Sequence, residues 1–298
     1  MGGKLVECVP NISEGRRAEV INAVVEAVRA TAGVRLLNVQ SDESHNRSVI
    51  TFAGSPEPAG EAAFALCARA VELIDMNEHH GEHPRLGAVD VVPFVPIANV
   101  TMPEAVALAR SLAGRLWEQL RVPVYYYAEA ATSPQRVRLP DIRKGEYEGL
   151  KEKIADPPWA PDVGEARPHP TAGATVVGAR RPLIAYNINL HSVAVDVAKQ
   201  IARAVRESSG GLVNVQALGV AAVTGQAQVS LNLLDHAATP LARVFELVRR
   251  EAERFGVTVA ESEIVGLVPL DAIVDVARYY LRLRGFDRTQ ILEARLME

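Results

Sequence analysis

The chain has 298 residues, of which 48% are apolar, and a formal net charge of -4. That apolar content is enough for a sizeable core in one large domain or two ordinary ones. The sequence has no dense Lys/Arg run, so we expect no nucleic-acid partner. Its apolar runs are short and broken by proline, and its first residues lack a signal-peptide pattern, so we expect no membrane association. Two cysteines, Cys8 and Cys67, make no disulfide framework, so a cytoplasmic protein is expected.

Strand-like and amphipathic segments alternate along the first half of the chain. The patterns predict strands at 5–9, 34–39, 47–53, 89–94 and 122–127, and helices at 16–31, 55–74 and 103–120. Ser13 is expected to cap the first helix and Pro56 to begin the second. Thr101 and Glu104 have the spacing of a capping box for the third.

The stretch 128–181 is rich in proline, glycine and charged residues. We interpret it as a long irregular connector with one short helix near 147–154. Connectors of this length inside compact proteins are usually functional or disordered. Tyr147 and Trp159 indicate that this one is anchored to the rest of the protein.

The second half repeats the order of the first. Strands are predicted at 183–190, 212–220, 227–233 and 257–260, with helices at 192–207, at 239–255 and from 269 onward. Both halves contain β-α-β-β-α-β, the ferredoxin-like order. We therefore predict an α/β (α+β) fold of two ferredoxin-like βαββαβ-type subdomains, residues 1–180 and 181–298. Their mixed sheets are expected to face each other, with helices outside and a ligand cleft between.

Three of the seven histidines lie in the run His79-His80-Gly81-Glu82-His83-Pro84-Arg85, which we call the histidine loop, residues 79–85. The run matches the H-x-x-E-H pattern of inverted zinc peptidases, but Gly81 and Pro84 disfavour the helix which that chemistry needs. Three alternatives remain: another metal site with Asp75 or Asp90, a solvated loop, or a general acid–base site. In the last, a nearby carboxylate would orient a histidine, and Arg85 would bind a substrate carboxylate.

Other polar residues have weaker signals. Asparagines lie at or near predicted strand ends, where they satisfy turns or contact a polar heterocycle; these are Asn11, Asn46, Asn187 and Asn232. Arg47 and Arg180 are surface charges or carboxylate binders. The remaining histidines are taken as structural: His45, His169, His191 and His236. A nucleotide-binding glycine motif and a serine-hydrolase elbow are both missing from the sequence.

Nine segments, in one order along almost the whole chain, resemble the formiminotransferase family. They are LVECVPNISEG (5–15), NR (46–47), IDM (74–76), GEHPRLGA (81–88), RKGEYE (143–148), WAPD (159–162), GAR (178–180), IAYNINL (184–190) and VGLVP (265–269). The resemblance implies transfer of the formimino group from N-formimino-L-glutamate to tetrahydrofolate, a step of histidine degradation, which yields 5-formiminotetrahydrofolate and L-glutamate. It implies tetrahydrofolate as co-substrate, no metal, and a homodimer.

The resemblance also assigns residues. His83 corresponds to the catalytic histidine, which we expect to act as general base. The family's folate-binding loop corresponds to Gly164, Glu165, Ala166, Arg167, Pro168, His169, Pro170, Thr171, Ala172 and Gly173. Both substrates carry carboxylates, so Arg47, Arg85 and Arg180 are expected anchors, with Asn11 and Asn187 as further substrate contacts.

Two departures and several alternatives accompany this assignment. Gln40 stands where the animal enzyme has an acidic residue, although Asp42 is close, and the chain ends where that enzyme continues into a cyclodeaminase. The second activity is therefore expected to be absent. The same site would also serve formyl transfer between 5-formyltetrahydrofolate and glutamate. A non-catalytic folate-binding protein and a zinc hydrolase are the alternatives from other classes.

Overall fold

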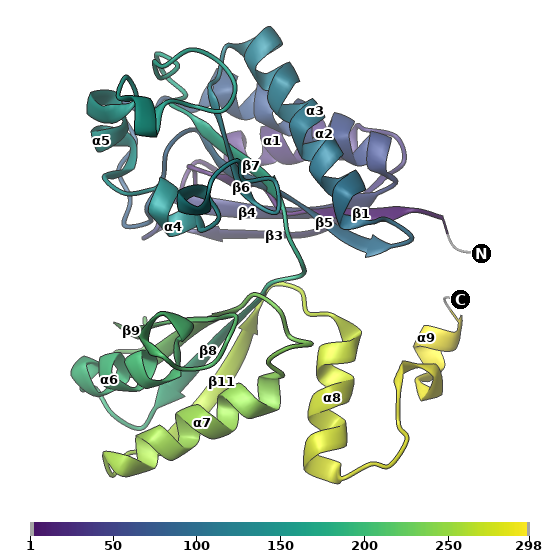
Figure 1. The fold of residues 1–298 in the computed structure, drawn as a ribbon, viewed down its shortest axis with the longest axis vertical. Helices are drawn as coiled ribbons and strands as arrows, with labels where there is room; N and C mark the ends of the chain where they lie inside the picture. Colours follow the sequence, from purple (N-terminus) through teal and green to yellow (C-terminus); the bar gives the residue numbers. More distant parts are fainter. Residues whose placement is uncertain (1–2, 297–298) are drawn as a thin grey trace. The chain divides into compact units, whose positions relative to one another are not determined.

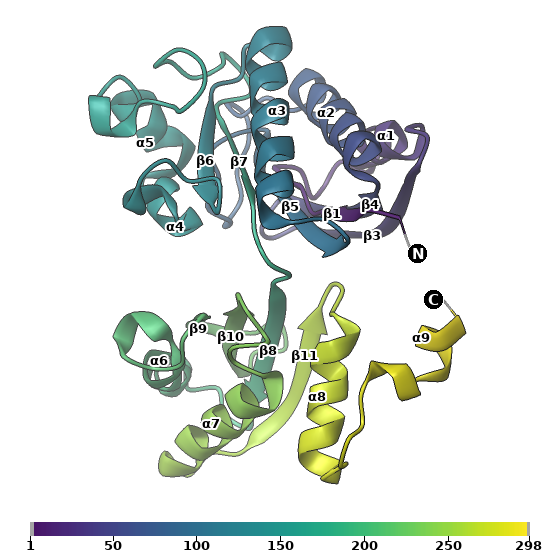
Figure 2. The same cartoon turned by 45° about the vertical axis from the view of Figure 1, so that its right-hand side comes forward.

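A computed structural model describes residues 3–296. The chain divides between Arg180 and Arg181 into two compact units, which we call unit 1 and unit 2 (Figures 1 and 2). Each unit has its own sheet and its own buried apolar cluster. They are described separately below.

Unit 1 is built on a seven-stranded sheet. Its elements in chain order are β1 (Leu5–Cys8), β2 (Asn11–Ile12), α1 (Ala18–Arg29), β3 (Val34–Asp42), β4 (Arg47–Gly54), α2 (Pro56–Leu73), β5 (Val89–Ala98), α3 (Met102–Leu120), β6 (Val124–Ala128), α4 (Leu139–Ile142), α5 (Glu146–Lys153) and β7 (Thr175–Ala179). Both β1 and β2 pair with β4 and β5, so they act as one interrupted strand. The order β3-β4-β1/β2-β5 is antiparallel throughout, which is the ferredoxin-like arrangement, and β7 and β6 extend it in parallel.

Alternate side chains of the strands pack on the two faces of this sheet. The helices α1, α2 and α3 cover one face, where Ile50, Phe52 and Phe94 are fully buried (Figure 2). On the opposite face, α4 and α5 cover only the β5-β7-β6 end, over a cluster that includes Tyr125 and Tyr127. The part of that face formed by β3, β4 and β1/β2 carries polar residues such as Arg47 and Asn11.

The interpretation of 128–181 as an irregular connector was wrong at its end. Residues 175–179 form β7, which is buried along its length and pairs with β5 on one side and β6 on the other. The segment is only five residues long and follows a proline- and glycine-rich stretch, so its pattern alone does not separate a central strand from a loop. The predicted short helix does form, as α5 at Glu146–Lys153.

One predicted helix cap also differs. The Ser13 hydroxyl donates to the carbonyl oxygen of Gly87 over 2.7 Å and does not cap α1. The N-cap residue of α1 is Arg17, which has no side-chain cap, and Oε1 of Glu14 accepts the backbone N–H groups of Arg16 and Arg17 just before the helix at 2.8 and 2.9 Å. The capping box of Thr101 and Glu104 forms at the start of α3 as expected. The segment 13–15 is thus fastened to the residues just before β5.

Unit 2 has a four-stranded antiparallel sheet in the order β11-β8-β10-β9, again the ferredoxin-like arrangement. Its elements are β8 (Ile184–Leu190), α6 (Val195–Val205), β9 (Val215–Ala221), β10 (Ala227–Leu233), α7 (Leu241–Arg254), β11 (Val259–Val265), α8 (Leu270–Leu281) and α9 (Leu292–Leu296). The helices α6 and α7 pack on one face through residues such as Ile201 and Val244. The prediction of two ferredoxin-like subdomains is therefore confirmed. None of the helices in residues 3–296 is long and apolar enough to cross a membrane.

Candidate active site

The histidine loop lies between α2 and β5 and has no helical turn. It packs on the turn at 43–46 that joins β3 to β4. The backbone of Glu82 donates to the carbonyl oxygen of Ser44 over 3.3 Å. At Gly81, a Cβ would lie 2.4 Å from the carbonyl oxygen of His45, so this close approach requires glycine. The zinc-peptidase pattern therefore does not occur on a helix here.

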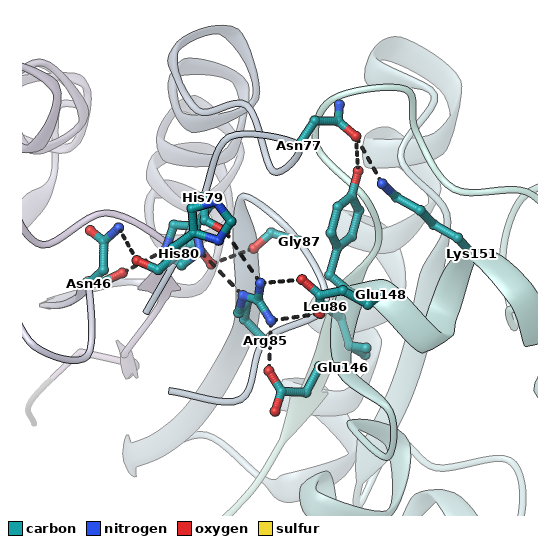
Figure 3. A network of polar contacts seen from close by, with 12 residues as sticks. Asn46, Asn77, His79, His80, Arg85, Leu86, Gly87, Glu146, Glu148 and Lys151 are labelled. Carbon is teal, nitrogen blue, oxygen red and sulfur yellow. Dashed lines mark hydrogen bonds and ion pairs between the residues drawn. The ribbon is translucent and has the colours of Figure 1, made fainter. Parts of the chain in front are cut away.

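Asn46 and His79 hold the loop in this position (Figure 3). Asn46 has φ +46°, and its amide accepts from the Gly15 backbone and donates to the carbonyl oxygen of His80 at 3.0 Å. Buried His79 directs Nε2 at the backbone carbonyl oxygen of Asn46, 2.9 Å away, so this ring nitrogen donates. Burial lowers the pKa of His79, which keeps it neutral, and a structural role follows.

Arg85 is buried and its guanidinium is fully engaged (Figure 3). It forms ion pairs with Glu146 at 2.7 Å and Glu148 at 2.6 Å, both on α5, and its Nε donates to Nδ1 of His79 at 3.2 Å. These contacts join the histidine loop to the connector. The geometry favours a positioning role for Arg85, while substrate binding by this residue stays a prediction.

His83 is partly buried and contacts Arg47 at the start of β4. Nη1 of Arg47 lies 2.8 Å from Nε2 of His83. A guanidinium only donates, so Nε2 accepts and the neutral ring carries its proton on Nδ1. Burial, together with the charges of Arg47 and Arg143, lowers the pKa of His83 to about 2. In this arrangement His83 is a neutral imidazole whose lone pair is occupied.

Arg47 has an N–H group that makes no hydrogen bond in the described part of the chain. Its Nε is buried and has no hydrogen-bond partner among residues 3–296. Burial and the charge of Arg143 lower the pKa of Arg47, although an arginine stays protonated at physiological pH. A partly buried guanidinium with an unused donor is suited to a carboxylate ligand, which takes two parallel hydrogen bonds.

A second imidazole lies beside His83. The rings of His45 and His83 are edge-on, with centroids 6.2 Å apart. Nδ1 of His45 lies 3.0 Å from Oδ2 of Asp42, at the end of β3. Oδ1 of Asp42 accepts from the Ser44 hydroxyl at 2.7 Å and from the backbone of His45 at 2.9 Å. Burial opposes ionisation of Asp42, but these hydrogen bonds outweigh it and hold its pKa well below the usual range.

Asp90 and Arg143 form a buried ion pair near the same site. Both carboxylate oxygens of Asp90 accept from Arg143, and Oδ1 also accepts from the Leu86 backbone at 3.0 Å. Asp75 instead accepts from Asn77 within its own turn, and Glu82 is exposed. The structure therefore gives the ring of His83 a guanidinium contact where the sequence analysis expected a carboxylate.

The predicted folate loop, residues 164–173, joins the histidine loop's neighbourhood through its second half. The backbone of Met76 donates to Thr171 at 2.7 Å, and that of Ala88 donates to Ala172 at 2.9 Å. Nδ1 of His169 accepts from the backbone N–H of Ala172 at 3.0 Å. Residues 164–167 are exposed, with Glu165 and Arg167 paired at 2.7 Å. Residues 169–173 are thus held by hydrogen bonds, while residues 164–167 are exposed.

The remaining predicted contacts are spread more widely. Asn11 lies on β2 opposite Val49 of β4, on the face that also carries Arg47. Arg180 follows β7, near Glu7 and Tyr127; burial raises the pKa of both, and Arg180 partly offsets the rise. Asn187 is in unit 2, where it donates to Glu263 at 3.0 Å.

Sequence reasoning missed two residues next to His83. His45 was taken as structural, and Arg143 was noted only within the RKGEYE motif. The adjacency of His45 to the Asn46-Arg47 motif was a usable signal. Within residues 3–296, no group of three or more His, Cys, Asp and Glu side chains is arranged to hold a metal ion.

Comparison with known proteins covers both units. A model of the formiminotransferase domain, N-terminal subdomain, matches residues 5–180, and a model of the formiminotransferase domain matches residues 185–294. The chain is 47% identical over 296 residues to a glutamate formimidoyltransferase of Streptococcus pyogenes serotype M1, covering 99% of each. It is 48% identical over 295 residues to one of Thermoplasma acidophilum, covering 98% of this chain and 97% of the relative.

A longer relative matches in part. The chain is 49% identical over 285 residues to the formimidoyltransferase-cyclodeaminase of Sus scrofa, a match that covers 93% of this chain and 52% of that protein. The two domain models together span most of the chain, and the first two relatives match it from end to end. The chain therefore belongs to the formiminotransferase family.

Proposed function

We propose that this chain is a glutamate formimidoyltransferase, which transfers the formimino group of N-formimino-L-glutamate to tetrahydrofolate and releases L-glutamate. The observation that carries the proposal is the pairing of His83 with Arg47 inside a chain whose end-to-end relatives have that name. A histidine able to move a proton thus stands beside a guanidinium suited to a carboxylate.

His83 is the proposed general base for N5 of tetrahydrofolate. His83 does not take a proton while Arg47 donates to its Nε2 and the pKa of His83 is about 2. A substrate carboxylate that engages Arg47 draws the guanidinium away and neutralises its charge, which frees Nε2 and raises the pKa of His83. Substrate binding therefore activates the base. General acid–base help of this kind contributes on the order of 10²–10⁴-fold to the rate.

The other predicted residues supply binding. Residues 164–173 contact the folate, with residues 164–167 exposed and residues 171–173 held by backbone hydrogen bonds. Arg180 and Asn11 are further candidates for polar groups of the substrates, and Asn187 is a candidate on β8. The ligand cleft and the direct use of Arg85 stay predictions. Holding two substrates in register supplies much of the remaining acceleration.

The proposed setting is a homodimer in the cytoplasm. Cys8 and Cys67 are buried free thiols, which fits a reducing compartment. The dimer rests on the family resemblance alone. Measuring the molar mass of the protein in solution tests whether it is a dimer.

A spectrophotometric assay with tetrahydrofolate and formiminoglutamate tests the function. We expect turnover in the parent, a fall in kcat of roughly 10²–10⁴-fold in His83→Ala, and unchanged folate binding. His80→Ala is the matched control, because His80 is an exposed histidine three positions away. Turnover only with 5-formyltetrahydrofolate and glutamate would identify formyl transfer. Folate binding with neither activity would indicate a binding protein.

A further inference from the structure

Two imidazoles meet at this site, and the proposed function so far uses one of them. Moving the formimino group requires a proton to leave N5 of tetrahydrofolate and another to reach the departing glutamate nitrogen. A single residue performs both steps only in sequence. His83 starts the reaction without a transferable proton on Nε2, because that nitrogen accepts from Arg47.

His45 contacts a carboxylate where His83 contacts a guanidinium. Oδ2 of Asp42 lies 3.0 Å from its Nδ1, which places the proton there and directs Nε2 away from the carboxylate. The structure, over residues 3–296, records no hydrogen bond to that Nε2. Asp42 is itself fixed by the Ser44 hydroxyl and the His45 backbone. A carboxylate so placed orients an imidazole and stabilises the imidazolium that forms on proton uptake.

The surroundings of the two rings differ in charge. His83 faces Arg47 on β4, Arg143 after α4, and Arg85 in the histidine loop, as well as His45 itself. The charged partner of His45 is Asp42 on β3. Two groups of one residue type are thus placed in opposite electrostatic environments, which is how a pair divides acid and base functions. The 6.2 Å between ring centroids lets the two imidazoles act on the two nitrogens that flank the formimino carbon in the adduct, N5 and the glutamate nitrogen.

We infer that His45, oriented by Asp42, is the general acid that protonates the departing glutamate nitrogen. This inference rests on the proposed function. As the N5–carbon bond forms, His83 takes the N5 proton. As the bond from carbon to the glutamate nitrogen breaks, its electron pair takes the Nε2 proton of the His45 imidazolium. The net change moves one proton from N5 to the amine, and return of a proton from His83 to His45 through solvent resets the site.

The test compares His45→Gln, Asp42→Asn and His80→Gln by the pH dependence of kcat. In the parent we expect a bell-shaped pH dependence of kcat, with a low-pH limb from a base that must be unprotonated and a high-pH limb from an acid that must be protonated. His45→Gln should lower kcat about 100-fold and abolish the high-pH limb, with folate affinity unchanged. Asp42→Asn should also lower kcat, because it removes the charge beside His45. The loss should be smaller than in His45→Gln, because the imidazole and the backbone turn remain. His80→Gln should match the parent.

A variant with no side chain at position 45 allows a second measurement, rescue of activity by added imidazole. Imidazole added to the buffer should restore part of the activity of His45→Gly, since it can occupy the space that the side chain has vacated. The same imidazole should not change the high-pH limb of the kcat profile of His83→Gln. A His45→Gln enzyme that is as stable as the parent, keeps both limbs and retains kcat within about threefold would overturn the role of His45 alone. A parent without turnover on either one-carbon donor would overturn the proposed function, and this role with it.

Discussion

Arg47 donates from Nη1 to Nε2 of His83 over 2.8 Å, so the guanidinium occupies the atom through which the imidazole would accept a proton. In this arrangement the imidazole is neutral, as a general base must be, but its lone pair is occupied by the guanidinium. Four predictions follow from this relationship and from the contacts that support it.

Arg47→Gln should raise the pKa of His83 from about 2 toward its ordinary value near 6.5, because it removes the nearest positive charge. A titration of ring-labelled histidines by NMR, with His83→Gln for assignment, measures it. The same variant should raise KM for formiminoglutamate if Arg47 holds its carboxylate. Arg35→Gln, an exposed change on β3, should do neither. An unchanged pKa of His83 in Arg47→Gln would show that Arg47 does not lower the pKa of His83.

The depressed pKa of His83 predicts a pH-dependent stability. Between pH 6.5 and about 2 the unfolded chain binds a proton at His83 that the folded chain does not, so this residue makes the fold less stable as the pH falls through that window. Above pH 6.5 both states are neutral and the effect vanishes. The free energy of unfolding, measured with denaturant at pH 7.5, 6 and 5, should therefore fall less steeply with pH in His83→Gln than in the parent. Parallel curves for the two proteins would contradict the neutral, buried state of His83.

Arg85→Met should destabilise the region between the histidine loop and α5. The change keeps the aliphatic volume but removes the contacts to Glu146, Glu148 and His79, and hydrogen bonds to charged groups are worth about 1.5–3 kcal/mol each at most. Both glutamates are partly exposed, so we expect the low end, about 1–2 kcal/mol. Hydrogen exchange should increase at residues 79–85 and 146–153. Arg69→Met, which removes an exposed pair with Glu72, should leave exchange unchanged.

Gly81→Ala should lower activity through position alone. Its Cβ would meet the His45 carbonyl oxygen at 2.4 Å, so the histidine loop must move away from the turn at 43–46. We expect kcat to fall about tenfold or more, since displacements near 1 Å cost up to about 100-fold. Gly114→Ala is the control, because nothing lies within 4 Å of that Cβ on α3. Alanine favours a helix over glycine by about 1 kcal/mol, so this variant should be active and at least as stable. Full activity in Gly81→Ala would show that the loop position is not critical.

The periodic elements were predictable because their signals are local. Helices such as α3, with its capping box, and the alternating strand β4 follow from their own residues. The strand β7 was not, since its five residues become a strand through pairing with partners that lie far away in the sequence. Tertiary pairing, rather than local pattern, decided that element.

The site divides in the same way. His83 stands out as one of three clustered histidines, and the family motifs mark it further. Its partners do not stand out, because Arg47 and His45 meet it only after the histidine loop folds onto the β3–β4 turn. Arg143 comes from the connector, and its charge is felt at His83 only across the folded unit. Electrostatic character of this kind is a property of the assembled structure.

The central position of β7 also bears on how the protein is made. During synthesis β5 and β6 emerge first, but the strand that pairs with β6 along its whole length is β7, which begins 47 residues after β6 ends. A ribosome-bound chain that ends before residue 175 therefore carries an unsatisfied strand edge at β5 and an unpaired β6, both of which attract other chains. Only when residue 179 has emerged do these edges close, and the predicted folate loop is drawn into place at that moment. We therefore expect completion of the sheet and placement of the predicted folate loop to occur together on the ribosome.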